Sequence, residues 1–149
     1  MSRKYVIDGA QTVASPTDSV LGLTSATTVR PKVFSLIFGS NASPADNALQ
    51  WLLQRYTAAG TATAVTPQKL DPGDPVALAS AGENHTVEPT YTADEILLNV
   101  SVNQRATFQW IARPGCELVL PATAANGVGL QPVHASFAGD VQATMFFEE

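Results

Sequence analysis

The residue types that could perform chemistry are few and lie far apart in the chain. The only histidines are His85 and His134, and the only cysteine is Cys116. They could form a Cys/His pair, but they lie in separate segments and no local spacing supports one. A zinc site needs three or four ligands at spacings such as C-x-x-C or H-x-x-x-H, which are absent. We interpret the histidines as surface or hydrogen-bonded residues, and Cys116 as a small buried hydrophobic residue that has no disulfide partner.

Oxygen ligands for a metal are concentrated in one proline-rich segment, residues 66–90. They are Asp71, Asp74, Glu83, Asn84 and Glu88. Calcium takes oxygen ligands of these kinds, but their spacing matches no known calcium loop. We interpret them as solvated loop residues and predict no metal site.

Five aromatic residues could stack on sugar rings. They are Trp51, Tyr56, Tyr91, Phe108 and Trp110. Aromatic residues at alternating strand positions are more typical of a hydrophobic core, where they bury a large apolar area. We expect them to belong to the core.

Enzyme motifs are absent from the chain. It has no phosphate-binding glycine-rich loop and no G-x-S-x-G, and the pair Gly127-Val-Gly129 lacks the third glycine of a dinucleotide site. We predict that the protein is not an enzyme, with no catalytic residue, no cofactor and no metal.

Composition limits the kinds of partner. The 149 residues suit one domain, 45% of them are hydrophobic and only 14% are charged, against about a quarter in an average protein. The net charge is −5 and no run of Lys and Arg exists, so direct binding to nucleic acid or an anionic membrane is not expected. No membrane span or signal peptide is predicted, so we expect the protein to be made in a cytoplasm.

The N-terminal segment, residues 1–32, differs from the rest. It is rich in Ser, Thr, Gly and Ala, and carries four basic against two acidic residues, whereas the remainder carries four basic against eleven acidic residues. We interpret it as an extended arm with brief strands that attaches to a partner. The alternative is that residues 5–7 and 20–23 are ordinary strands of the main fold.

The remaining residues, 33–149, are predicted to form mostly β-structure. Residues 96–102 alternate apolar and polar side chains, with Ile96, Leu98, Val100 and Val102 on one face, which predicts a half-buried strand. Several short strands separated by turn residues are typical of a β-sandwich or barrel. The other segments predicted to be strands are 33–38, 107–112, 117–120, 135–137 and 141–147.

Two segments leave alternatives open. Residues 43–57 could form a helix capped by Ser43, or a strand whose faces alternate from Leu49 to Tyr56. Residues 66–90, with four prolines, are expected on the surface or at a neighbouring subunit, with one helical turn near residues 75–81.

Several phrases of the sequence together resemble a family of small proteins from the structural gene clusters of tailed bacteriophages. The phrases are TAAGTATAVTP at 57–67, LDP at 70–72, EPTYT at 88–92, NQRATFQWI at 103–111, PG at 114–115, ELVLPAT at 117–123 and NGVG at 126–129. The family consists of capsid cement or decoration proteins, and the resemblance runs from about residue 33 to the C-terminus.

The resemblance implies a fold and a function. It implies a jelly-roll-like antiparallel β-sandwich, with residues 48–57 as a strand. It also implies a homotrimer that binds the major capsid protein on the outer surface of the virion and stabilises the head, which is assembled in the host cytoplasm. The alternative is a carbohydrate- or receptor-binding β-sandwich of a phage tail or fibre, which predicts an exposed aromatic cluster. A cupin-like metalloenzyme would need more histidines than two.

Overall fold

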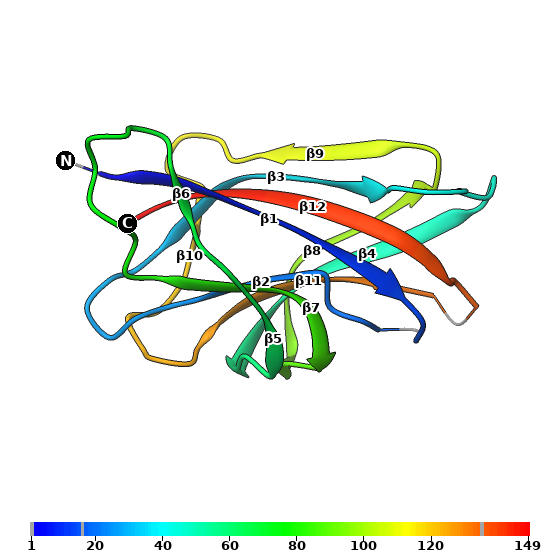
Figure 1. Cartoon of the computed structure of the whole chain (residues 1–149), viewed down its shortest axis with the longest axis horizontal. Coiled ribbons are helices and arrows are strands. Elements are labelled where there is room, and N and C mark those ends of the chain that lie inside the picture. The colour runs from blue at the N-terminus through cyan, green and yellow to red at the C-terminus, as the bar shows by residue number, and fades with distance from the viewer. Residues whose placement is uncertain (1, 16, 135) are drawn as a thin grey trace.

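The computed structural model describes residues 2–15, 17–134 and 136–149, and these residues form strands and no helix. Two six-stranded antiparallel sheets pack as a sandwich (Figure 1), which confirms the predicted all-β fold. The strands are β1 (Lys4–Val13), β2 (Leu21–Thr24), β3 (Lys32–Ser40), β4 (Ala48–Ala58), β5 (Thr61–Val65), β6 (Gln68–Lys69), β7 (Ser80–Val87), β8 (Thr90–Asn103), β9 (Thr107–Ile111), β10 (Leu118–Val119), β11 (Gly127–Val133) and β12 (Gly139–Glu148).

The strand order is that of a jelly roll with one insertion. Sheet A runs β10-β3-β12-β1-β6, with β9 also paired to β3, and sheet B runs β5-β7-β2-β11-β4-β8. Without β5, β6 and β7, eight positions remain, with β9 and β10 sharing one of them. Along the chain they alternate between the sheets, except that β4 and β8 are neighbours in sheet B. That pattern is the double Greek key of a jelly roll.

The core lies between the two sheets and is built by alternate residues of each strand. On β4, Leu49, Trp51 and Leu53 are at most 1% exposed. The Trp51 ring packs on Phe38 of β3 with ring centroids 4.7 Å apart, which joins the sheets. The strand expected at residues 48–57 is confirmed and the helix alternative is wrong, because pairing with β8 and β11 and burial of one face outweigh the weak local helix signals.

Within residues 1–32, the two strands belong to the sandwich. β1 pairs with β12 over ten residues, from Lys4–Glu148 to Val13–Gly139, and β2 pairs with both β11 and β7. Tyr5 and Leu21 are fully buried. The structure therefore agrees with the alternative interpretation of ordinary strands, and a separate extended arm is not what these residues form. The reason is that β1 supplies a full alternating face of core residues, whose burial favours docking.

The long strand β8 changes phase at a bulge. Leu53 of β4 is opposite Leu98, but the next residue, Gln54, is opposite Ile96, so Leu97 is an extra residue in the ladder. As a result Ile96 is 43% exposed, although simple alternation placed it on the inner face with Leu98. The predicted half-buried strand is confirmed, with this correction.

The strand β11 was not anticipated, because its sequence resembles a glycine-rich loop. It is buried from Gly127 to Pro132 and lies between β2 and β4. Its ladder with β2 ends at Leu130, so Pro132 falls where a missing N–H is tolerated. The strand expected at residues 135–137 is not formed by residues 136–137, while Ala135 lies outside the described residues.

Residues 80–87, which were expected to lie in the surface connection at 66–90, instead form β7, which pairs with both β2 and β5 and buries Ala81 and His85. The rest of that connection, residues 66–79, lies on the surface, as expected, without the predicted helical turn. It lies against the chain ends (Figure 1): Leu70 N–H donates to the Lys4 carbonyl, and the Glu149 carboxylate accepts from Leu78 N–H at 2.7 Å. Val76, 70% exposed, projects into solvent.

Candidate functional site: the closed end of sheet B and the open side of the sandwich

Sheet B is rolled at one end so that its two edges meet. β4 and β5 are four strand positions apart in the sheet, as are β7 and β8, yet residues 59–60 alone link the first pair and residues 88–89 the second. Four positions in a flat sheet span about 19 Å. A two-residue link joins Cα atoms at most about 11 Å apart. The sheet must curl, and the ends of β4, β5, β7 and β8 gather together (Figure 1).

The face of sheet B inside this curl is lined by glycines. Gly22 of β2 is opposite both Gly82 of β7 and Gly129 of β11, and Gly127 is opposite Tyr56. A Cβ atom on Gly129 would lie 2.3 Å from the Tyr91 hydroxyl oxygen. The glycines therefore leave room for tyrosine rings, which fill the curl from β4 and β8.

A partly buried network of polar groups holds the rolled end together. The Glu88 carboxylate accepts hydrogen bonds from the backbone N–H of Ser19, at 3.0 and 3.1 Å, and from the Ser19 hydroxyl. The Ser19 hydroxyl oxygen also lies 2.7 Å from the Tyr91 hydroxyl. The segment before β2 is thereby joined to the β7–β8 link, which is 69 residues away in the chain. Because these groups are largely withdrawn from water, each bond that is lost would leave an unpaired buried group.

Three further side chains complete the closed end, which we define as the buried and half-buried groups of Ser19, Thr24, Tyr56, His85, Glu88 and Tyr91. The Tyr56 hydroxyl lies 2.7 Å from the Thr24 hydroxyl, and burial raises the pKa of Tyr56 to about 12. His85 Nδ1 lies 3.1 Å from the Ser19 carbonyl oxygen, which can only accept, so Nδ1 carries the proton. Burial lowers the pKa of His85, so the ring is neutral at pH 7.

Chemically, the closed end is suited to holding structure rather than to reaction. Glu88 is engaged by Ser19, and the two tyrosines are kept protonated by burial, with the pKa of Tyr91 also raised. The polar groups of the curl bond to one another across segments of the chain. This arrangement specifies the closure of the sheet.

The other end of the strand order gives the sandwich an open side. β8 is the last strand of sheet B, and β9 forms part of the edge of sheet A next to it (Figure 1). Leu98, Val100 and Val102 of β8 face the core yet are only half-buried, as are Phe108 and Trp110 of β9. On β4, one strand further in, the inward residues are fully buried. The core is therefore partly accessible between β8 and β9.

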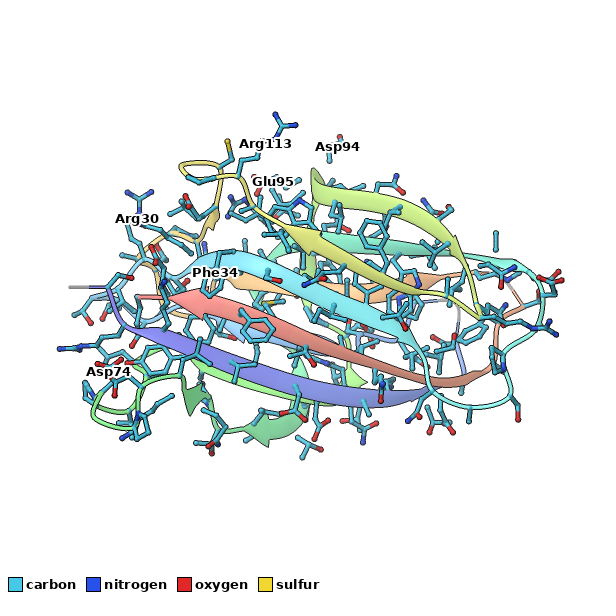
Figure 2. The ribbon with its side chains drawn as sticks, turned by 90° about the horizontal axis from the view of Figure 1, so that it is seen from above. Arg30, Phe34, Asp74, Asp94, Glu95 and Arg113 are labelled. Atoms are coloured by element: carbon cyan, nitrogen blue, oxygen red, sulfur yellow. The ribbon has the colours of Figure 1, made fainter. Side chains whose placement is uncertain are left out.

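This open side, which we define as residues 96–111, carries almost no charge. Arg105, in the turn between the two strands, is its single charged residue. The acidic residues Asp94 and Glu95 come just before it and Arg113 just after it, and Figure 2 shows all three on the same side of the molecule, at the top of the view. In the described part of the chain no strand pairs with the outer edge of β8. An uncharged edge with unpaired backbone groups is a ready surface for another strand.

The residues first considered for chemistry are dispersed. The His134 ring accepts a hydrogen bond from the Ser136 N–H at 3.2 Å and its carbonyl accepts one from the Phe137 N–H, so it serves local structure. Cys116 is exposed in a turn, so its expected burial is wrong. The Asp71 carboxylate accepts a hydrogen bond from the Gly73 N–H, and the Glu83 carboxylate accepts one from the Ala10 N–H. Both carboxylates therefore bind backbone groups of this chain. Over residues 2–15, 17–134 and 136–149, no three acidic, histidine or cysteine side chains come together in a way that could hold a metal.

Of the five aromatic residues that were expected in the core, Trp51 lies there, Tyr56 and Tyr91 fill the curl, and Phe108 and Trp110 are half-buried against the core at the open side. Trp51 and Tyr56 are 1% and 2% exposed, and Phe108 packs on Phe38 at 5.4 Å. The closed end was not predicted, because Ser19 and Glu88 are remote in sequence and carry no motif. No helix in the described residues could cross a membrane.

Comparisons with family models, with curated proteins and with solved structures found no match for this chain.

Proposed function

We propose that this chain is an accessory protein of a bacteriophage head, a cement or decoration protein that binds the outer surface of the shell formed by the major capsid protein. The proposal begins with the sequence phrases from residue 57 to residue 129, which resemble that family. Fold alone does not imply function, so the assignment needs the support of a specific expectation and a direct test.

The observation that carries the proposal is the strand order. The sequence resemblance implies a jelly roll, and most of the possible ways to arrange twelve strands would contradict it. The eight main strand positions follow the jelly-roll order, with β5, β6 and β7 added at the side of β1 and β2.

The surface of the molecule also suits a binding protein. Only 14% of residues are charged, and residues 96–111 form an almost uncharged side of the sandwich. Low charge makes contact with another protein less costly, because fewer ionic groups lose water. On the head, a protein that binds only the assembled arrangement of capsid subunits stabilises it by mass action, as any ligand specific for one state does.

Undecorated heads provide the test. The purified protein should co-sediment with heads from which it has been removed, saturate at a fixed copy number, and raise the temperature at which the heads release DNA. Absence of binding at micromolar protein, with heads that bind the protein from a fresh lysate as the positive control, would refute the proposal. We also propose the homotrimer that the resemblance implies, and a stable monomer in light scattering at micromolar protein, with no shift on concentrating, would refute it.

The carbohydrate- or receptor-binding alternative has less support. It required exposed aromatic residues, whereas Trp51 and Tyr56 lie below the surface and Tyr91 covers Gly129 inside the curl.

A further inference from the structure

We propose that the open side is a contact between two copies of this chain, in which β8 of one copy pairs antiparallel with β8 of a second copy across a two-fold axis at Val100. The pairing would join the two B sheets into one continuous sheet. It does not depend on the function proposed above. On a head it would link one trimer to the next.

The first argument is the state of the β8 edge. From Leu98 to Asn103, beyond the bulge at Leu97, the strand contains no charged residue, no proline and no further bulge, and these are devices that normally protect an exposed edge. Its inner side is paired with β4 in continuous register from Leu98 to Asn103, so the strand is already held straight. The alternate backbone N–H and C=O groups of its outer side are then free to pair.

The second argument is the apolar surface at the edge. Leu98, Val100 and Val102 point inward but remain half-buried, and Ile96 and Ile111 are 43% and 64% exposed. A second strand laid along β8 would cover the first three and remove apolar area from water.

Charge at the two ends of the edge favours a second copy as the occupant. Acidic residues precede the edge and Arg105 follows it, so antiparallel pairing of two copies brings the acidic end of each toward the basic end of the other. Glu95 already lies 3.8 Å from Arg55, and Arg105 lies in the turn after β8, so these two residues do not set the register. The register with its axis at Val100 rests on residues 98–102, where Leu98 falls opposite Val102 and Asn99 opposite Ser101. A strand from an unrelated protein would have to supply this pattern, whereas this chain already contains it.

A cysteine at the axis tests the register directly. In a Cys116→Ser background, which removes the exposed native thiol, Val100→Cys should form a disulfide-linked dimer under mild oxidation. Directly opposed residues in an antiparallel pair have Cα atoms about 5 Å apart, within disulfide range. The matched control is Val102→Cys, which is equally half-buried, but whose two copies would be separated by about 13 Å along the strands. Cross-linking of Val102→Cys as fast as Val100→Cys, or of neither, would overturn the proposal.

Charge on the edge provides the second test. Asn99→Lys with Ser101→Lys, both at exposed positions, would place lysines opposite lysines twice, and should slow cross-linking of Val100→Cys at least about tenfold. The same pair of changes on the other edge of sheet B, Thr61→Lys with Thr63→Lys, should leave the rate unchanged. If the edge lysines have no effect, cross-linking reflects random collision and the proposal fails. If they instead prevent head binding while cross-linking persists, the edge serves the shell protein, which also refutes pairing between copies.

Discussion

The two ends of the strand order in sheet B differ in how their polar groups are paired. At the closed end, the sheet rolls until its edges meet, and Glu88, Ser19 and Tyr91 satisfy one another within the chain. At the open side, β8 leaves its outer edge unpaired and its apolar residues half-buried. In this sandwich the closed end therefore serves the stability of the fold, and the uncharged open side serves association with a partner. Substitutions at the closed end should change folding, and substitutions at the open side should change what the protein contacts.

Deletion of residues 1–32 should have the largest effect. It removes Ser19, Gly22 and Thr24 from the closed end together with the whole of β1, while every residue of the open side remains. The deletion takes a ten-residue strand from beside β12 and exposes the core that Tyr5, Ile7 and Val13 help to form, so the protein should not fold. Circular dichroism and amide exchange measure this. A folded truncated protein would show that the arm is dispensable and would restore the interpretation of residues 33–149 as an independent domain.

Gly127→Ala should destabilise the closed end strongly. The added methyl carbon would lie 2.2 Å from the Leu23 carbonyl oxygen and 2.5 Å from the Tyr56 ring, and a backbone atom in a paired strand cannot move aside easily. We expect a loss of roughly 3 kcal/mol in the free energy of unfolding. Gly73→Ala is the control, since its methyl would meet only the Asp71 side chain, at 3.3 Å. Equal stabilities for the two variants in urea titrations would contradict the packing described for the curl.

The closed end should also make stability fall at alkaline pH. Burial raises the pKa of Tyr56 from 10.0 to about 12, so the unfolded chain loses this proton at a lower pH than the folded protein does. Stability from this group is complete below pH 10 and should fall by between roughly 2 and 3 kcal/mol as the pH rises to about 12. Tyr91, whose pKa burial also raises, adds to the decline.

Denaturant titrations at several pH values measure this slope. Tyr56→Phe should reduce it and leave the contribution of Tyr91. At acid pH the sign reverses for His85: its pKa is lowered by burial, so its contribution is present above 6.5 and is lost as the pH falls below that value. A wild-type protein with the same stability at pH 9 and pH 12 would mean that the tyrosines are accessible to water.

How far the sequence could predict these regions depends on whether the information is local. The strands β3, β4 and β8 carry regular alternation, so their existence could be predicted, and the uncharged run of the open side is visible in the sequence. The strand β11 could not be predicted, because Gly127 and Gly129 are unfavourable in isolated strands. They are favoured here by the close approach of the Leu23 carbonyl oxygen and of the Tyr56 and Tyr91 rings.

Long-range pairing explains the other failures of sequence reasoning. The closed end joins Ser19 to Glu88, and no local pattern relates two residues so far apart. The N-terminal segment looked like an arm because its composition is polar. Its alternate residues Tyr5 and Ile7 nevertheless form part of the core, and only the partner strands β12 and β6 reveal this. The bulge at Leu97 is also set by pairing with β4, not by the residues of β8.

The smallest effect on stability should come from the open side. Asn99→Lys with Ser101→Lys changes two exposed side chains on a strand whose paired side is untouched, and Asn99 loses only its exposed hydrogen bond from the Gln50 amide. We expect the free energy of unfolding of the single chain, measured in urea at sub-micromolar protein, to change by less than about 0.5 kcal/mol. The same variant should lose association between copies, as argued above. A loss of stability as large as that from Gly127→Ala would show that β8 contributes to the fold as much as the closed end does, and the separation of folding from association would then be wrong.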